Sequence, residues 1–291
     1  MKKYQMILLI ALAFMTVVPN INAQWGPLQK NVYFATYAID IYPDPDDANS
    51  RAKITANAFF NTLSSRMAAS SYNSNGVTCW RYIKREDEAV TWDNWFNDDT
   101  HWCDFLFYYG HGYDGRISVH DDRWLGGTYL VDLNEKPLWL CTKWAFFNAC
   151  TALNRDNRSV YMPRNAFQGL HAMFGFKSQT YEFKETYKPY KAFLKITTKS
   201  EDWTSDFSLY WVIGWSMWDA YKNAINARMY KEGRVVGVAP TTFYVWKTIN
   251  GRYFEGHKEK FKDVYHYSVP SSTAGMGCSW VAYGNPIYYV L

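Results

Sequence analysis

The sequence predicts an α/β fold, a three-layer sandwich whose central sheet is mostly parallel. One observation is a set of short runs of aliphatic and aromatic residues, at 31–39, 104–112, 144–150 and 170–176, each stopped by small or polar residues. Another is a segment with helical periodicity after the first run and a second one after the last. Strands that alternate with helices in this way are typical of α/β proteins with a parallel sheet.

The N-terminal part is predicted to form a strand, a helix and a weaker strand. The run at 31–39 ends at the turn residues Tyr42-Pro-Asp-Pro-Asp-Asp47. A helix is expected over Ser50–Ala69, because its apolar residues recur at spacings of four and three and make one face. That face consists of Ala52, Ala56, Phe59, Leu63 and Met67. A loop at 70–76 and a weaker strand at 77–83 follow.

Two strands in the middle of the chain each end in a reactive residue. The first run reads Asp104-Phe-Leu-Phe-Tyr-Tyr-Gly-His111-Gly112, and the second reads Trp144-Ala-Phe-Phe-Asn-Ala-Cys150. After the first run, residues 113–133 are predicted to form a loop or hairpin that turns at Gly115, Gly126 and Gly127. If the two strands are parallel neighbours, His111 and Cys150 emerge side by side at the carboxyl edge of the sheet, where open α/β sheets place their sites.

The remaining elements continue the alternation. After a polar loop at 151–163, the strand at 170–176 contains His171, which we expect to be a core histidine with satisfied hydrogen bonds. A single helix is predicted over 206–230, with one apolar face. That face consists of Ile213, Met217, Ala220, Ala224 and Ala227.

The C-terminal part is predicted to form strands at 235–238 and 243–246, and it ends in the apolar residues 286–291. No repeat or linker interrupts the chain, so residues 24–291 are expected to form one domain.

The first 23 residues have the pattern of a secretory signal peptide. Lys2 and Lys3 precede the apolar run Met6–Val18, and small residues lead to Gln24. The run is too short to span a bilayer. No cysteine lies near the cleavage site, so a lipid anchor is not predicted. We therefore expect a secreted or periplasmic protein without a membrane anchor. Removal of the two lysines lowers the net charge from +4 to +2, which gives no reason to expect nucleic acid as a partner.

Aromatic residues make up 19% of the chain. They fit either a rigid extracellular core or a surface that stacks on sugars or on the side chains of a partner protein. Most of them lie inside apolar runs, which favours the core.

The five cysteines leave at least one thiol unpaired within the chain. Cys103 lies eight residues before His111, and Cys141 lies nine before Cys150. If the two strands are aligned, Cys103 and Cys141 approach each other at the opposite edge of the sheet. A Cys103–Cys141 disulfide would leave Cys79–Cys278 as a second possible pair and Cys150 as the thiol. Other connectivities remain open.

A thiol beside an imidazole at a strand end is the minimum set of groups for nucleophilic acyl transfer. Cys150 would attack a carbonyl carbon as thiolate, and His111 would orient the leaving group or protonate it. The backbone N–H groups of Gly112 and Cys150 would hold the developing oxyanion. Taken singly, a buried cysteine is usually a small hydrophobic residue and a histidine is usually structural. Their joint occurrence at two strand ends favours catalysis.

The other polar residues give weaker indications of a substrate pocket or a metal site. Asp114, Asp121 and Asp122 form either an acidic pocket for a substrate Arg or Lys or, more simply, solvated loop carboxylates. A metal site built from His101, Cys103, His111, His120 and Asp121 is not expected. Cys103 and His111 would lie at opposite ends of one strand, more than ~20 Å apart at ~3.3 Å per residue. No metal or other cofactor is therefore predicted.

The two strand ends resemble the cysteine peptidase clan that contains caspases, legumains, gingipains and clostripain. The matching positions are His111-Gly112 and Ala149-Cys150, separated by 39 residues. The stretch 167–176 is similar to the strand that follows the cysteine in secreted bacterial caspase-like proteins of unassigned function. The resemblance covers residues 31–176 and implies a caspase-like sandwich, a Cys-His dyad and no third orienting acid. The chain departs from the caspase signature, since Asn148-Ala-Cys150-Thr-Ala152 replaces Gln-Ala-Cys followed by glycine two positions on, so specificity for aspartate is not implied.

Together these observations predict a secreted cysteine endopeptidase that acts on a peptide or protein. Two rival functions remain. One is a pseudoenzyme with the same site and no turnover, and the other is a module that binds glycans or proteins through its aromatic residues. A dyad that transfers the acyl group to an amine, as some members of the clan do, is a third reading.

Overall fold

The computed structural model describes residues 31–42, 51–69, 78–98, 100, 103–121, 127–133, 142–154, 167, 170–177, 200–231, 240–249, 252–261, 275–282 and 285–290. The predicted signal peptide and the predicted strand at 235–238 lie outside these residues. Among the described residues, no helix combines the length and apolar character needed to cross a membrane.

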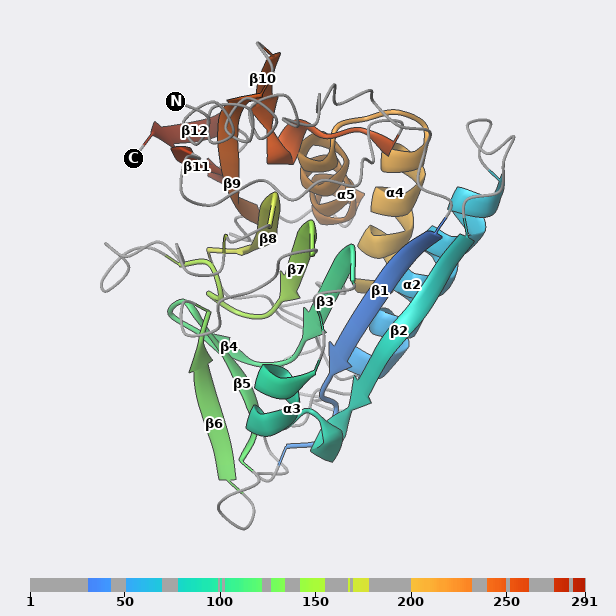
Figure 1. Cartoon of the computed structure of the whole chain (residues 1–291), viewed down its shortest axis with the longest axis vertical. Helices are drawn as coiled ribbons and strands as arrows, with labels where there is room; N and C mark the ends of the chain where they lie inside the picture. Colours follow the sequence, from blue (N-terminus) through green and yellow to red (C-terminus); the bar gives the residue numbers. More distant parts are fainter. Residues whose placement is uncertain are drawn as a thin grey trace, which may run out of the picture.

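A nine-stranded sheet forms the centre of the protein, with the order β12-β11-β9-β8-β7-β3-β1-β2 and with β10 paired to β9 (Figure 1). Neighbouring strands from β2 to β8 are parallel, whereas β9 to β12 pair antiparallel. The α/β class and the mostly parallel central sheet are thus confirmed. The parallel strands are β1 Asn31–Ala38, β2 Thr78–Glu86, β3 Phe105–Tyr109, β7 Trp144–Asn148 and β8 Ala172–Phe176. The antiparallel strands are β9 Pro240–Ile249, β10 Arg252–Glu255, β11 Gly275–Ala282 and β12 Asn285–Val290.

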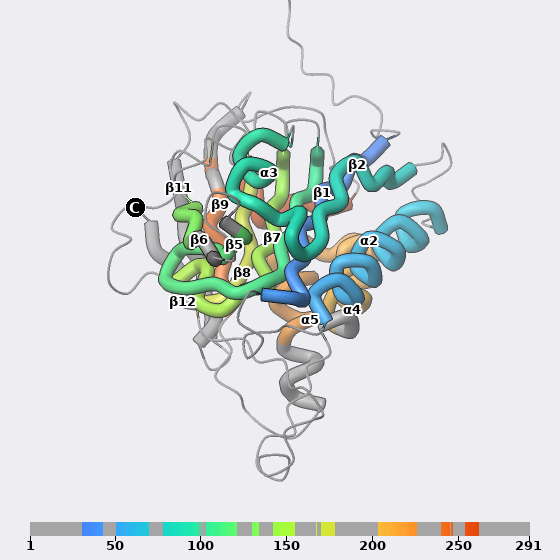
Figure 2. The backbone as a smooth tube through the Cα atoms, turned by 90° about the horizontal axis from the view of Figure 1, so that it is seen from below, coloured from blue at the N-terminus to red at the C-terminus, as the bar shows by residue number. Residues whose placement is uncertain are grey.

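Helices cover one face of the parallel strands. Figure 2 shows α2, α4 and α5 together on that side. Their bounds are α2 Ala52–Ala69, α4 Ser200–Val212 and α5 Met217–Lys231. Phe59 of α2 packs against Phe34, Phe107 and Phe146 of the sheet. The predicted apolar face of α2 is confirmed, since all five of its residues are buried.

The other face of the sheet carries a short helix and a small second sheet. These elements are α3 Trp92–Asn97, β4 Gly112–Tyr113, β5 Arg116–Asp121 and β6 Gly127–Asp132. Trp95, Ile117 and Val131 pack from them onto Tyr108 and Phe147. The strands between these layers are apolar on both faces because both faces are buried. The predicted hairpin at 113–133 is confirmed as β4-β5-β6.

The single helix predicted over 206–230 is wrong, because the chain breaks between α4 and α5. Gly214 adopts φ +107°, which ends the first helix. Ser216 then caps α5, as its hydroxyl accepts from the N–H of Asp219 and donates to the Asp219 carboxylate. Ile213, assigned to the buried face, is instead 57% exposed.

The predicted Cys79–Cys278 disulfide is corrected by the order of the strands. Cys79 lies on β2 and Cys278 on β11, six strand spacings apart. That separation is about 29 Å at ~4.8 Å per strand, far beyond the reach of a disulfide. Cys103 is buried, and Cys141 lies outside the described residues, so the Cys103–Cys141 pair stays a prediction.

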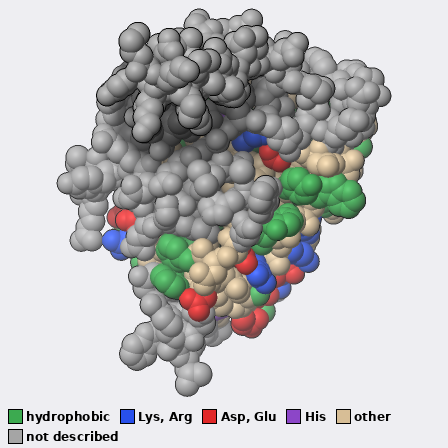
Figure 3. Space-filling model, viewed as in Figure 1, with side chains coloured by type: hydrophobic (Ala, Val, Ile, Leu, Met, Phe, Trp, Pro, Cys, Tyr) green, Lys and Arg blue, Asp and Glu red, His purple; other side chains and the backbone are tan. Residues whose placement is uncertain are grey.

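Aromatic side chains are also exposed at the β2 edge of the sheet. Trp80 and Tyr82 are 55% and 50% exposed, and the ring of Tyr82 meets Tyr33 of β1 edge-on at 6.2 Å. Figure 3 shows hydrophobic side chains gathered on the side of the molecule that β2 borders. Most of the aromatic side chains that the structure describes nevertheless lie in the two cores, as the sequence predicts.

Candidate active site

The two predicted reactive residues lie at the same edge of the sheet. β3 and β7 are parallel neighbours in unbroken register from Phe105–Trp144 to Tyr109–Asn148. His111 follows β3 after one residue, Gly110, and Cys150 follows β7 after Ala149. The N–H of Gly110 donates to the carbonyl of Asn148 at 3.4 Å, which continues the pairing to the strand ends. His111 and Cys150 are therefore brought to adjacent positions at the carboxyl edge.

Accessibility distinguishes Cys150 from the other described thiols. Cys79 and Cys103 are buried, whereas Cys150 and His111 are partly exposed. Burial raises the pKa of Cys79 to about 12, so this thiol stays protonated at neutral pH. Of these three thiols, Cys150 is the one that a substrate can reach.

Gly112 brings its backbone against that of Cys150. A β carbon at position 112 would lie 2.6 Å from the Cys150 carbonyl oxygen and 2.8 Å from the β carbon of Ala149. Only glycine fits such a close approach. The Ser118 N–H donates to the His111 carbonyl, which makes Gly112 and Ile117 a non-hydrogen-bonded pair of the β4–β5 ladder. The N–H of Gly112 thus points away from β5, as an oxyanion donor would require.

Strained backbone joins the two loops behind the site. Asp114 and Thr151 adopt φ +42° and +48°, a region that residues with a side chain rarely occupy. The N–H of Asp114 donates to the Thr151 hydroxyl, the N–H of Gly115 to the Thr151 carbonyl, and the Asn154 amide to the Asp114 carboxylate. Such strain persists only where its surroundings enforce it, and it concentrates at functional sites.

Tyr42 forms a contact with His111 that the sequence does not reveal. The His111 N–H donates to the Tyr42 hydroxyl at 2.6 Å, and the two ring centroids lie 4.3 Å apart. The hydroxyl of Tyr108 donates to the carbonyls of Ser118 and His111. A β carbon on Gly110 would collide with both tyrosine hydroxyls, which explains glycine before the histidine. Sequence assigns Tyr42 only to a turn, because its partners lie more than 60 residues away.

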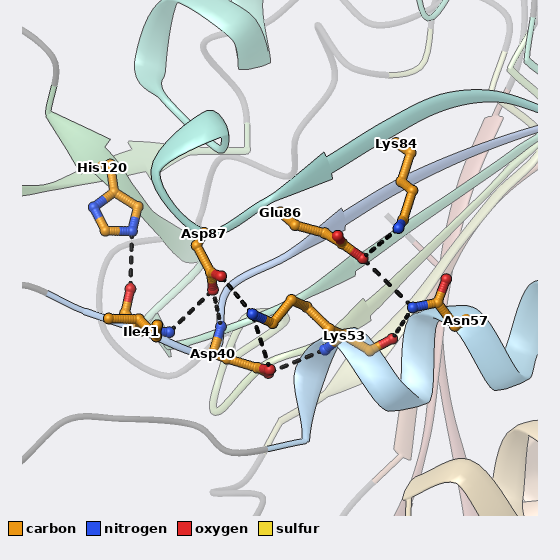
Figure 4. A network of polar contacts seen from close by, with 8 residues as sticks. All are labelled: Asp40, Ile41, Lys53, Asn57, Lys84, Glu86, Asp87 and His120. Carbon is orange, nitrogen blue, oxygen red and sulfur yellow. Dashed lines mark hydrogen bonds and ion pairs between the residues drawn. The ribbon is translucent and has the colours of Figure 1, made fainter.

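A polar network lies beside Tyr42 (Figure 4). The Asp87 carboxylate accepts from the backbone N–H groups of Asp40 and Ile41 and from the Lys53 ammonium. Burial alone would raise the pKa of Asp87, but these hydrogen bonds outweigh it and lower the pKa below its ordinary value. The hydrogen bond to Asp87 raises the pKa of Lys53. Both groups are therefore charged at neutral pH.

Of the aspartates predicted to form an acidic pocket, Asp114 and Asp121 lie near opposite ends of β5. Asp114 lies in the exposed turn before β5, beside the Cys150 loop, whereas Asp121 ends β5, about 16 Å further along at ~3.3 Å per residue. The side chain of Asp121 and the whole of Asp122 lie outside the described residues. The backbone separation of Asp114 and Asp121 does not favour a shared pocket, and the part of the pocket that involves Asp122 stays a prediction.

His171 and His120 have structural partners. His171 is fully buried, and its Nδ1 lies 2.8 Å from the Glu259 carboxylate, so the predicted core histidine is confirmed. His120 contacts the Ile41 carbonyl through Nε2 at 3.0 Å. His101 lies outside the described residues, and the described ones contain no cluster of acidic, histidine and cysteine side chains suited to a metal ion.

Comparison with known proteins identifies a family without an assigned activity. A family model described as a domain of unknown function, DUF6345, matches residues 44–268. This match spans more than half of the chain, so the protein belongs to the DUF6345 family. No curated protein matches the sequence.

Proposed function

We propose that this member of the DUF6345 family is a caspase-like cysteine endopeptidase, with Cys150 as nucleophile and His111 as general acid and base. The observation that carries the proposal is the position of the two residues directly after neighbouring parallel strands, with the Gly112 backbone against Cys150. The resemblance to the caspase clan supports it, because in that clan both blocks also lie at strand ends.

The proposed reaction has two halves. The Cys150 thiolate bonds to the carbonyl carbon of the scissile peptide, and the N–H groups of Gly112 and Cys150 stabilise the oxyanion. His111 gives a proton to the leaving nitrogen as the C–N bond breaks, which leaves a thioester and a free amine. Water then attacks the thioester, loses a proton to His111 and releases a carboxylic acid and the thiolate. An added amine acceptor that replaces water would yield a new amide, so product analysis separates hydrolysis from transpeptidation.

Site-directed substitution tests this assignment. In a peptide-library assay, wild-type protein should cleave and Cys150→Ala should not, with both proteins showing the same circular dichroism. Cys103→Ala is the matched control. It removes a buried thiol just before β3, at the opposite edge of the sheet from Cys150, and should retain cleavage. Equal cleavage by Cys150→Ala would exclude the assignment, and absence of cleavage in wild type under all conditions would favour the pseudoenzyme.

The exported location is part of the proposal. Residues 1–23 would direct secretion or periplasmic export, and the mature chain would begin at Gln24. N-terminal sequencing of the exported protein tests this, since an intact Met1 would contradict it.

A binding module is the second candidate function, and the exposed Trp80 and Tyr82 favour it. Aromatic side chains of this kind stack on sugars and on protein partners. A glycan site there predicts that tryptophan fluorescence responds to oligosaccharides, that Trp80→Ala abolishes the response, and that Cys150→Ala leaves it intact.

A further inference from the structure

The segment Asp40–Tyr42, which follows β1 and is called the Tyr42 arm below, touches His111 from a distant part of the sequence. Tyr42 is 3% exposed, so its ring lies inside the protein against the imidazole. Two different contacts join the residues, since the ring covers the imidazole and the hydroxyl accepts from the His111 N–H. One side chain thus restrains both the ring and the backbone of His111.

The hydroxyl of Tyr42 is itself held in place. It is hydrogen-bonded to Tyr108, whose hydroxyl also reaches the His111 carbonyl. Burial raises the pKa of Tyr108 well above its ordinary value, so its hydroxyl keeps its proton and remains a donor. The N–H and the C=O of His111 are therefore both bonded to buried tyrosine hydroxyls.

The backbone of the arm is fixed from two sides, as Figure 4 shows. On one side, Asp87 accepts from the N–H groups of Asp40 and Ile41, at 2.9 and 3.1 Å. On the other, His120 of β5 contacts the Ile41 carbonyl. Asp87 holds this position at φ +46°, a strained conformation, and its ion pair with Lys53 of α2 secures the carboxylate. These bonds tie the arm to the turn that follows β2, to β5 and to α2 at once.

We propose that the Tyr42 arm positions His111 for acid–base catalysis, with Tyr42 as the positioning residue that contacts the imidazole and Asp87 as the residue that anchors the arm. The proposal rests on the proposed peptidase function of His111. It supplies the orienting element of a dyad for which the resemblance to the caspase clan implies no third acid. A catalytic base must be held within hydrogen-bond reach of its partner. An unrestrained imidazole could rotate out of that reach.

Two readouts separate positioning from mere stability. The first is inactivation by a peptidyl acyloxymethyl ketone, with its maximal rate and its binding constant measured separately. The second is the imidazole resonance of His111 in protein labelled with ¹³C-histidine, assigned by its loss in His111→Gln. The ring of Tyr42 shifts this resonance through its ring current, which does not depend on activity.

Three substitutions divide the contact into its parts. Tyr42→Leu removes the ring and hydroxyl, and should lower the inactivation rate about 100-fold with an unchanged binding constant, and move the His111 resonance. Tyr42→Phe keeps the ring, and should lower the rate about tenfold and leave the resonance nearly in place. Tyr221→Phe is the control, because it removes a buried hydroxyl that donates to the Gly175 carbonyl on the helical face. It should leave both readouts at their wild-type values.

The outcomes decide the proposal. A wild-type rate in Tyr42→Leu, or an equal loss in Tyr221→Phe, overturns it. If wild-type protein shows no labelling of Cys150, the proposed peptidase function fails instead. The resonance then still decides the arm: displacement in Tyr42→Leu but not in Tyr221→Phe supports it, and an unmoved resonance overturns it.

Discussion

The two edges of the parallel sheet differ in how their polar groups are arranged. At the amino edge, Asp104 and Lys143 form an ion pair at 2.8 Å whose side chains are only 6% and 5% exposed. Asp104 also accepts from the Tyr33 N–H, so β1, β3 and β7 are joined there. At the carboxyl edge, His111 and Cys150 are partly exposed. The three described non-glycine residues with positive φ, Asp87, Asp114 and Thr151, all lie at that edge.

The difference indicates a division of labour between the edges. The amino edge satisfies its charges and holds β3 and β7 in register, and that register determines which residues meet at the other end. The carboxyl edge stores strain and remains accessible, as functional sites do. Substitutions should therefore affect stability at the amino edge and chemistry at the carboxyl edge.

Asp104→Ala should have the largest effect on folding. It would leave the Lys143 ammonium buried without its carboxylate, at a cost of about 3–5 kcal/mol in the free energy of unfolding. Urea unfolding measures this, with Glu88→Ala as the control, because Glu88 is exposed at the other edge just after β2 and its replacement should stay within about 0.5 kcal/mol of wild type. Similar losses in both variants would remove the distinction between the edges.

Gly112→Ala should damage the site more than the fold. Its methyl group would meet the Cys150 carbonyl and the Ala149 side chain, which separates the two strand ends. We expect labelling of Cys150 to slow about 100-fold, since small displacements of reacting groups cost this much. Gly115→Ala is the control, because a β carbon at position 115 would contact nothing, although the alanine would have to adopt φ +79°. It should lose stability and keep labelling, and a Gly112→Ala protein that labels normally would contradict the close approach.

Asp87→Asn should have the smallest effect, with a characteristic dependence on pH. The folded-state pKa of Asp87 is lowered, so its stabilisation is complete above the ordinary pKa and is lost as pH falls through the folded value. We expect a loss of about 1–2 kcal/mol at pH 7 relative to wild type. The difference should begin to shrink below about pH 4, where the Asp87 carboxylate of the unfolded chain becomes protonated, and should vanish once the pH falls below the lowered folded-state pKa. Urea unfolding at both pH values checks this, and a difference that does not change with pH would exclude the ion pair with Lys53 as its cause.

Much of the scaffold could be predicted because parallel strands buried on both faces read as apolar runs. β3, β7 and β8 are such runs, and the face of α2 follows helical periodicity. Parallel order then brings two strand ends together, which places His111 near Cys150 from sequence alone.

The features that were not predicted from the sequence depend either on contacts between distant residues or on local signals that conflict with the apolar periodicity. The helix break was readable from Gly214 and from the capping pair Ser216 and Asp219, but apolar spacing ran through it. The Cys79–Cys278 pair failed because sequence does not reveal strand order. Tyr42 and Asp87 could not be assigned, since each acts through partners that only the fold brings near.

The central claim, that the carboxyl edge is a cysteine peptidase site, is tested most directly by mapping where an acyloxymethyl ketone probe bonds. Wild-type protein, His111→Gln and Cys150→Ala would be treated alike, digested and analysed by mass spectrometry. The account predicts one adduct on Cys150 in the wild type, a strongly reduced yield in His111→Gln and no adduct in Cys150→Ala. An adduct on Cys79 or Cys103, or equal labelling of Cys150 with and without His111, would contradict it.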